Sequence, residues 1–143
     1  MSERNKAIVR RYLERVIGKG DWAVADELLV PDFVFTSPYT PEPVRGREAF
    51  KGMIGALRAS FPDMHVEEHA VIAEGDLVAT RWLGAGTHTG APFGAVPAGG
   101  KHWEMTGMSM YRVREGRIVE GWLNDDTFGM MRQLGAIPDA AHP

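Results

Sequence analysis

The chain has 143 residues, 44% of them hydrophobic and 24% charged, which suits one domain with a sizeable core and is too short for two. Sixteen lysines and arginines against nineteen aspartates and glutamates give a net charge of -3. A chain without an excess of positive charge is not expected to bind the phosphate backbone of a nucleic acid. The absence of cysteine excludes disulfides, thiolate nucleophiles and cysteine-bound metals. The first eighteen residues carry charges throughout, unlike a signal peptide or membrane span, so we expect a cytoplasmic protein without a membrane partner.

The first half of the chain predicts three helices. Apolar residues recur with the rhythm of one buried helix face in the first and third of them. Asp21 is placed to cap the second helix, and Pro62 ends the third. Residues 32–36 predict a strand, and the proline-bearing stretch 37–46 predicts a loop. The three predicted helices cover residues 8–17, 22–29 and 50–61.

The second half of the chain predicts antiparallel β-hairpins. Turn signals at 74–76 and 115–116 separate β-rich runs, which cover residues 64–74, 77–88, 101–114 and 117–126. Three helices followed by such a meander predict an α+β fold, with the helices on one face of a curved antiparallel sheet. The gap between sheet and helices would be a cone-shaped pocket. We expect a single domain over residues 1–135 and a flexible tail over 136–143.

Two motifs with familiar chemistry lie in the wrong context. His65 and His69 match the H-x-x-E-H spacing of zinc proteases, which need both histidines on one helix turn. Here they lie on a predicted strand, about 13 Å apart, so no metal site is expected. The glycine-rich stretch 84–90 misses the dinucleotide-binding pattern by one residue and precedes no helix.

Strand alternation places one carboxylate in the predicted pocket. Trp122, Asn124 and Asp126 share one face of the last strand, and a tryptophan favours the inner face. Asp126 is therefore predicted to project into an aromatic-walled cavity, and Asp125 to point to solvent. A carboxylate on an apolar wall suits general acid and base chemistry. The alternative is that Asp126 caps the C-terminal helix predicted over 127–134.

His88 has the same alternation as Trp82 on the 77–88 strand, provided that no bulge intervenes. It is thus a candidate partner of Asp126, and the alternative is a loop histidine that bonds its own hairpin. Arg81 has the opposite alternation and is predicted to point away from the cavity. The remaining candidates for substrate contact are Tyr12, Phe33, Phe35, Met53, Trp82, Met105, Ser109, Trp122 and Asn124.

Seven sequence blocks, spread over nearly the whole chain, carry a resemblance to one family. They are Gly20-Asp21-Trp22, Leu28–Val34, Phe61-Pro62-Asp63, Gly75–Trp82, Gly86–Gly90, Gly116–Trp122 and Asp126–Gly135. These blocks resemble the SnoaL-like polyketide cyclases (ester cyclases) of the nuclear transport factor 2-like superfamily. The resemblance implies an α+β cone, usually a homodimer, that needs neither a metal nor an organic cofactor.

The resemblance also implies a reaction. In the cyclases an aspartate at the D-x-x-G position acts as acid and base in an intramolecular aldol ring closure, and Asp126 occupies that position. His88 is the best candidate for the histidine partner that the cyclases have. The related ketosteroid isomerases use aspartates where this chain has Ser37 and Ser109, and a serine cannot replace a carboxylate base. Steroid isomerisation is therefore disfavoured.

The expected function is a cofactor-free acid/base enzyme acting on a hydrophobic, carbonyl-bearing small molecule. Two other interpretations stay open at this stage. One is a non-catalytic dimeric module of the same fold that holds an apolar ligand. The other is an epoxide-hydrolase-like enzyme, which would need two aspartates and an arginine around a water, with Arg81 as the available arginine.

Overall fold

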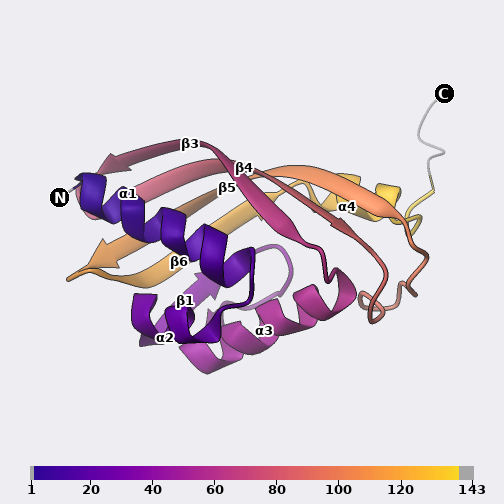
Figure 1. The fold of residues 1–143 in the computed structure, drawn as a ribbon, viewed down its shortest axis with the longest axis horizontal. Helices are drawn as coiled ribbons and strands as arrows, with labels where there is room; N and C mark the ends of the chain where they lie inside the picture. The colour runs from indigo at the N-terminus through magenta and orange to yellow at the C-terminus, as the bar shows by residue number, and fades with distance from the viewer. Residues whose placement is uncertain (1, 139–143) are drawn as a thin grey trace.

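Helices cover one face of a curved, six-stranded sheet in the computed structural model, which describes residues 2–138 (Figure 1). This arrangement confirms the predicted α+β class. The predicted tail extends beyond the described residues, which end at Pro138. In chain order the elements are α1 (Ser2–Arg11), the π-helix η1 (Tyr12–Ile17), α2 (Trp22–Leu28), β1 (Leu29–Thr36), β2 (Val44–Arg45), α3 (Arg47–Ser60), β3 (His65–Glu74), β4 (Leu77–Thr87), β5 (His102–Arg114), β6 (Arg117–Asp125) and α4 (Thr127–Gln133).

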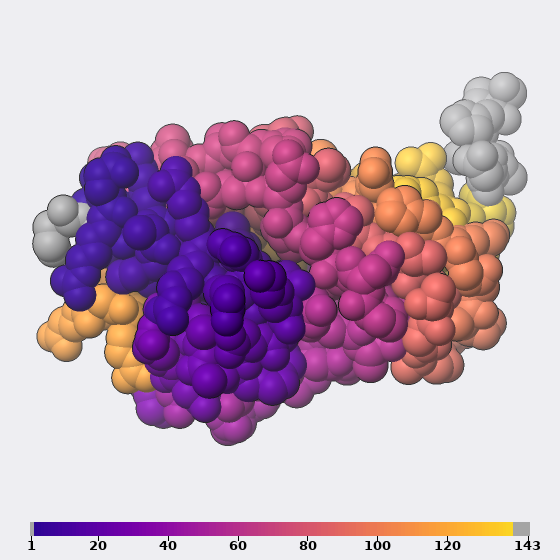
Figure 2. All heavy atoms as spheres, viewed as in Figure 1, coloured from indigo at the N-terminus to yellow at the C-terminus, as the bar shows by residue number. Residues whose placement is uncertain are grey.

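The strand order is β2-β1-β6-β5-β4-β3. The four long strands β3 to β6 form the predicted antiparallel meander, and β1 joins it in parallel beside β6. In the space-filling view the N-terminal helices and the segment from α3 into β3 cover this side of the molecule (Figure 2). Within residues 2–138, no helix is long and apolar enough to cross a membrane.

Two local features of the N-terminal half differ from the sequence prediction. The first helix changes from α to π geometry at Tyr12, and its widened last turns end where the Gly18 amide donates to the Leu13 carbonyl at 2.9 Å. Strand β1 begins at Leu29, earlier than predicted, and includes Pro31. Proline is tolerated there because the pairing of β1 with β6 shifts register between Leu29 and Val34. The predicted cap of α2 is confirmed, since Asp21 accepts the Val24 amide at 3.2 Å.

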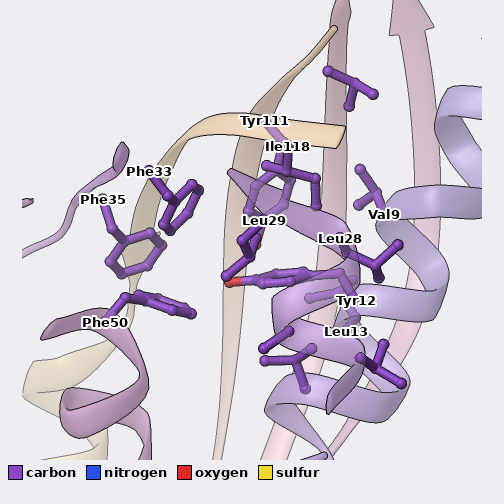
Figure 3. Packing of buried hydrophobic residues seen from close by; sticks show 14 of the residues in the cluster. Val9, Tyr12, Leu13, Leu28, Leu29, Phe33, Phe35, Phe50, Tyr111 and Ile118 are labelled. Atoms are coloured by element: carbon purple, nitrogen blue, oxygen red, sulfur yellow. The ribbon is translucent and has the colours of Figure 1, made fainter. Parts of the chain in front are cut away.

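The interior has two apolar clusters. One lies beneath the N-terminal helices and contains Tyr12, Phe33, Phe35, Phe50 and Tyr111, whose rings pack mainly edge to face (Figure 3). The other is built around Phe61, Trp82, Trp103, Met105 and Met130. Residues of both clusters line one internal cavity, so the core does not fill the whole space between sheet and helices.

The inner face of β6 is the opposite of the predicted one. Gly121 is buried and pairs with Tyr111 of β5, and a Cβ added to it would lie 3.1 Å from both the Tyr111 and Phe35 rings. A tryptophan has no room there, so Trp122 turns to the outer face, where the Arg112 guanidinium lies 5.9 Å from its ring centre. Alternation then places Leu123 and Asp125 inside.

Candidate functional site

The cavity has a volume of about 520 Å³ and lies between the inner face of the sheet and the helical segments η1 and α3. The loop residues 92–96 and helix α4 complete its wall. Its lining is dominated by aromatic, aliphatic and methionine side chains. A cavity of this size and character suits a drug-sized apolar molecule.

Asp125 is the only charged side chain among the described residues that line this cavity. It lies near the end of β6, opposite Gly107 of β5. The Tyr39 hydroxyl donates to Oδ2 of Asp125 at 2.7 Å, and the Thr127 hydroxyl donates to Oδ1. Both carboxylate oxygens are therefore held in a fixed orientation at the cavity wall.

Tyr39 reaches Asp125 from the loop that follows β1. Its ring is half-buried and meets Phe93 edge to face, with 6.5 Å between ring centres. Burial raises the pKa of the Tyr39 phenol well above its ordinary value, and the nearby Asp125 charge raises it further. Tyr39 thus remains a neutral hydrogen-bond donor. The sequence alone does not indicate Tyr39, because a loop has no periodicity to show where a side chain points.

Asp126, the predicted acid and base, does not line the cavity. Its side chain is exposed, and its carboxylate accepts the Gly129 amide at 2.9 Å as the N-cap of α4. The predicted placement was wrong because the alternation of β6 is reversed, and the geometry matches the capping alternative. Gly121 is the one feature of this segment that favours the other face, because a glycine inside a strand often marks the close approach of another group.

His88 has the inward alternation that its strand predicted, and the β4–β5 pairing runs from Leu77 to Thr87 without a bulge. It is only 1% exposed, but it packs behind Phe61, with 5.1 Å between ring centres, and does not line the cavity. Its Nε2 donates to the Ala91 carbonyl at 2.9 Å within its own loop. The structure therefore does not bring His88 to Asp125, and it matches the hairpin-bonding alternative.

The candidate contact residues divide into three groups. Phe33 is fully buried in the core against Phe50, outside the cavity lining. Trp122 and Asn124 lie on the outer face of the sheet, because the alternation of β6 is reversed. The candidates that do line the cavity are Tyr12, Phe35, Met53, Trp82, Met105 and Ser109.

The two histidines of the H-x-x-E-H motif lie on strand β3, as predicted, and both are exposed. A register shift at His69 changes their spacing along the strand but does not bring them together on a helix turn. No group of three or more potential metal ligands gathers anywhere in the part of the chain that the structure describes.

Comparison with known proteins identifies the family. The model of the SnoaL-like polyketide cyclase family matches residues 7–134, and the chain belongs to this family. The structure of IdmH from Streptomyces antibioticus, a candidate polyketide cyclase, is 37% identical, covers 92% of this chain and 98% of its own, and superposes with a TM-score of 0.80. No curated protein matches the chain.

More distant solved structures share the fold. A candidate SnoaL-like polyketide cyclase from Jannaschia sp. CCS1 is 23% identical over 96% of this chain and 95% of its own, with a TM-score of 0.86. AclR from Streptomyces galilaeus, a candidate hydroxylase, is 22% identical over 99% of this chain and 87% of its own, with a TM-score of 0.85. A shared fold does not fix the reaction, so the reaction must be argued from the site.

Proposed function

We propose that this protein is a cofactor-free acid/base enzyme of the polyketide cyclase type, in which Asp125 moves a proton at a carbon next to a carbonyl group. The observation that carries the proposal is the position of Asp125, the one charged group in the described lining of a largely apolar cavity. A substrate bound there is shielded from water and meets a single carboxylate. The family and the similarity to IdmH support the same chemistry.

The proposed reaction is an intramolecular aldol-type ring closure. The Asp125 carboxylate removes a proton from a carbon beside one carbonyl, and the resulting enolate carbon forms a bond to a second carbonyl carbon of the same molecule. The new alkoxide takes the proton back from the Asp125 carboxylic acid, so the enzyme is unchanged at the end. The Tyr39 and Thr127 hydroxyls orient the carboxylate through its two oxygens.

Hydrogen exchange into a simple ketone tests the first step without the natural substrate. 2-Tetralone is neutral and apolar, and exchange of its C1 protons in D₂O can be followed by proton NMR. We expect the wild type to accelerate this exchange, and Asp125→Asn to lower the accelerated rate by about 10²- to 10⁴-fold. Asp126→Asn is the matched control, because asparagine caps helices as well as aspartate does.

Equal exchange rates in the wild type and Asp125→Asn would remove Asp125 from the mechanism. A wild type that binds 2-tetralone without accelerating exchange would favour the non-catalytic binding module. The epoxide-hydrolase interpretation has less support, because Arg81 is exposed on β4 and no second carboxylate joins Asp125 in the described cavity lining.

We propose that a second copy of this chain covers the outer face of the sheet. An apolar row crosses four strands of this face through Ile72, Ala79, Met110 and Trp122, and Ile72 is 69% exposed. Charged side chains of both signs, Arg81 and Glu120, lie beside this row on the outer face, as a two-fold contact between identical surfaces requires. Light scattering of wild type and Ile72→Lys tests this: a wild-type monomer at micromolar concentration contradicts the proposal.

A further inference from the structure

The indole of Trp82 lies flat on the inner face of the sheet. A carbon added to Gly107 would be 2.8 Å from Cε2 and 2.6 Å from Cη2 of this indole, and nearer still to Cζ2 between them. A point outside the edge of a ring is clearly farther from the two flanking atoms than from the middle one. The small differences therefore place the added carbon over the ring face, and the glycine leaves the space that the indole occupies.

Two further contacts fix the orientation of this indole. Gly84 also lies beneath it, since a carbon added to Gly84 would be 3.1 Å from Cζ3 of Trp82. The indole Nε1 donates to the hydroxyl of the buried Ser109 at 2.9 Å. Two glycines and one hydrogen bond thus hold the ring against the sheet. Because the sheet covers one face of the ring, Trp82 lines the cavity with the opposite face.

The Trp82 ring stands beside Asp125 on this inner face. Gly107 of β5 pairs with Trp82 on one side and with Asp125 on the other. Directly opposite residues of an antiparallel pair have Cβ atoms roughly 4.5–5.5 Å apart, and Gly107 has no side chain, so the indole takes the place next to the carboxylate. Gly107 does not line the described cavity, because the ring covers it. A ligand that meets Asp125 in the cavity therefore also meets the indole.

An indole face that cannot tilt favours a flat ligand. Flat, unsaturated groups stack on an aromatic ring, and such a pair is stabilised beyond the apolar area that it buries. A puckered, saturated ring touches the same face only through its projecting hydrogens. Since Trp82 is held by the sheet and by Ser109, it does not follow the shape of a puckered ligand. The face thus distinguishes ligands by shape at the point where the carboxylate lies.

We infer that Trp82 is a specificity-determining residue, whose cavity-facing side stacks on a flat, unsaturated part of the substrate and holds the edge of that part beside Asp125. The observation that carries the inference is the glycine pair beneath the ring, which places the indole flat and next to the carboxylate. The inference rests on the proposed function, in that it concerns the same cavity, and it adds a shape requirement that proton transfer alone does not impose.

The test compares two ketones with one carbon skeleton, 2-tetralone and trans-2-decalone, of which only 2-tetralone has a flat aromatic ring. Calorimetry gives the two dissociation constants. We expect the wild type to bind 2-tetralone more tightly. This preference, expressed as the ratio of the two constants, should fall about three- to tenfold in Trp82→Leu, which keeps an apolar side chain but removes the flat face. Trp82→Phe has a smaller ring and should lose less.

Trp22→Leu is the matched control. It makes the same substitution at a tryptophan that begins α2, is 36% exposed and does not line the cavity. The preference for 2-tetralone should be the same in this variant as in the wild type. A wild type without that preference would overturn the inference, and so would an unchanged preference in Trp82→Leu. An equal loss in Trp22→Leu and Trp82→Leu would overturn the assignment to Trp82.

Proton NMR of the wild type supplies a measurement that does not depend on the variants. The aromatic protons of bound 2-tetralone should move upfield and show nuclear Overhauser effects to the ring protons of Trp82, and bound 2-tetralone without these effects contradicts the stacking. The two proposals fail separately. A wild type that prefers 2-tetralone but does not accelerate its exchange supports the role of Trp82 and contradicts catalysis by Asp125, whereas accelerated exchange without the preference does the reverse.

Discussion

Tyr39 and Asp125 are 86 residues apart in the chain, yet the tyrosine hydroxyl donates to the carboxylate at 2.7 Å on the cavity wall. The contact joins the loop after β1 to the end of β6, so it exists only in the folded protein. We therefore expect Tyr39 to act as a positioning residue for the proposed proton transfer.

Removal of the Tyr39 hydroxyl should slow catalysis more than it weakens binding. Tyr39→Phe keeps the ring against Phe93 but leaves Oδ2 of Asp125 without its donor. We expect about a tenfold lower maximal rate of 2-tetralone exchange, corresponding to ~1.4 kcal/mol, with a similar dissociation constant. In the Asp125→Asn background the same change should have no further effect, and an additive loss would show that Tyr39 acts independently of Asp125.

The capping role of Asp126 predicts a change in stability instead of a change in activity. Asp126→Ala removes the acceptor of the Gly129 amide and should lower the free energy of unfolding by about 0.5–2 kcal/mol. Urea titration gives this value. Asp126→Asn should retain most of the stability, and a catalytic loss in that well-folded variant would contradict the assignment of the proton transfer to Asp125.

The close packing around Gly121 on β6 predicts that a side chain at this position is unfavourable. A Cβ there would lie 3.1 Å from ring carbons of Phe35 and Tyr111, so Gly121→Ala should lower the free energy of unfolding by about 1–3 kcal/mol. Gly52→Ala, on α3 with nothing within 4 Å of the added carbon, should instead raise it by about 0.5–1 kcal/mol. Thermal unfolding of both variants tests this contrast.

Ionisation of the tyrosines should distinguish the folded from the unfolded chain. The chain has three tyrosines, and burial raises the pKa of each: Tyr12, Tyr39 and Tyr111. A pKa that is higher in the folded state means that the stabilisation is complete below about pH 10, the unfolded pKa, and is lost as pH rises through the folded value. Phenolate absorbance near 295 nm should therefore be absent from the native protein at pH 10.5 and appear on unfolding; its presence while the fold is intact would contradict the burial.

Much of the fold follows from local sequence patterns. Amphipathic rhythm, the Asp21 cap and the turn glycines predict the helices and hairpins, because these features act over a few residues. The inward alternation of β4 is confirmed by the burial of Val78, Thr80 and Trp82. Six of the candidate contact residues also line the cavity, since large apolar side chains in a small domain turn inward wherever space allows.

The sequence by itself determined that residues of equal parity on β6 share one face, but not which of the two faces is inside. Packing across the sheet decided that, because the Tyr111 and Phe35 rings leave space only for Gly121 between them. Because Gly121 lies on the inner face, Trp122 lies on the outer face and Asp125 lines the cavity. Asp126 follows the end of the strand and caps α4. The contact of Tyr39 with Asp125 was also visible only in the tertiary structure, because a contact between a loop and a distant strand produces no periodic pattern in the sequence.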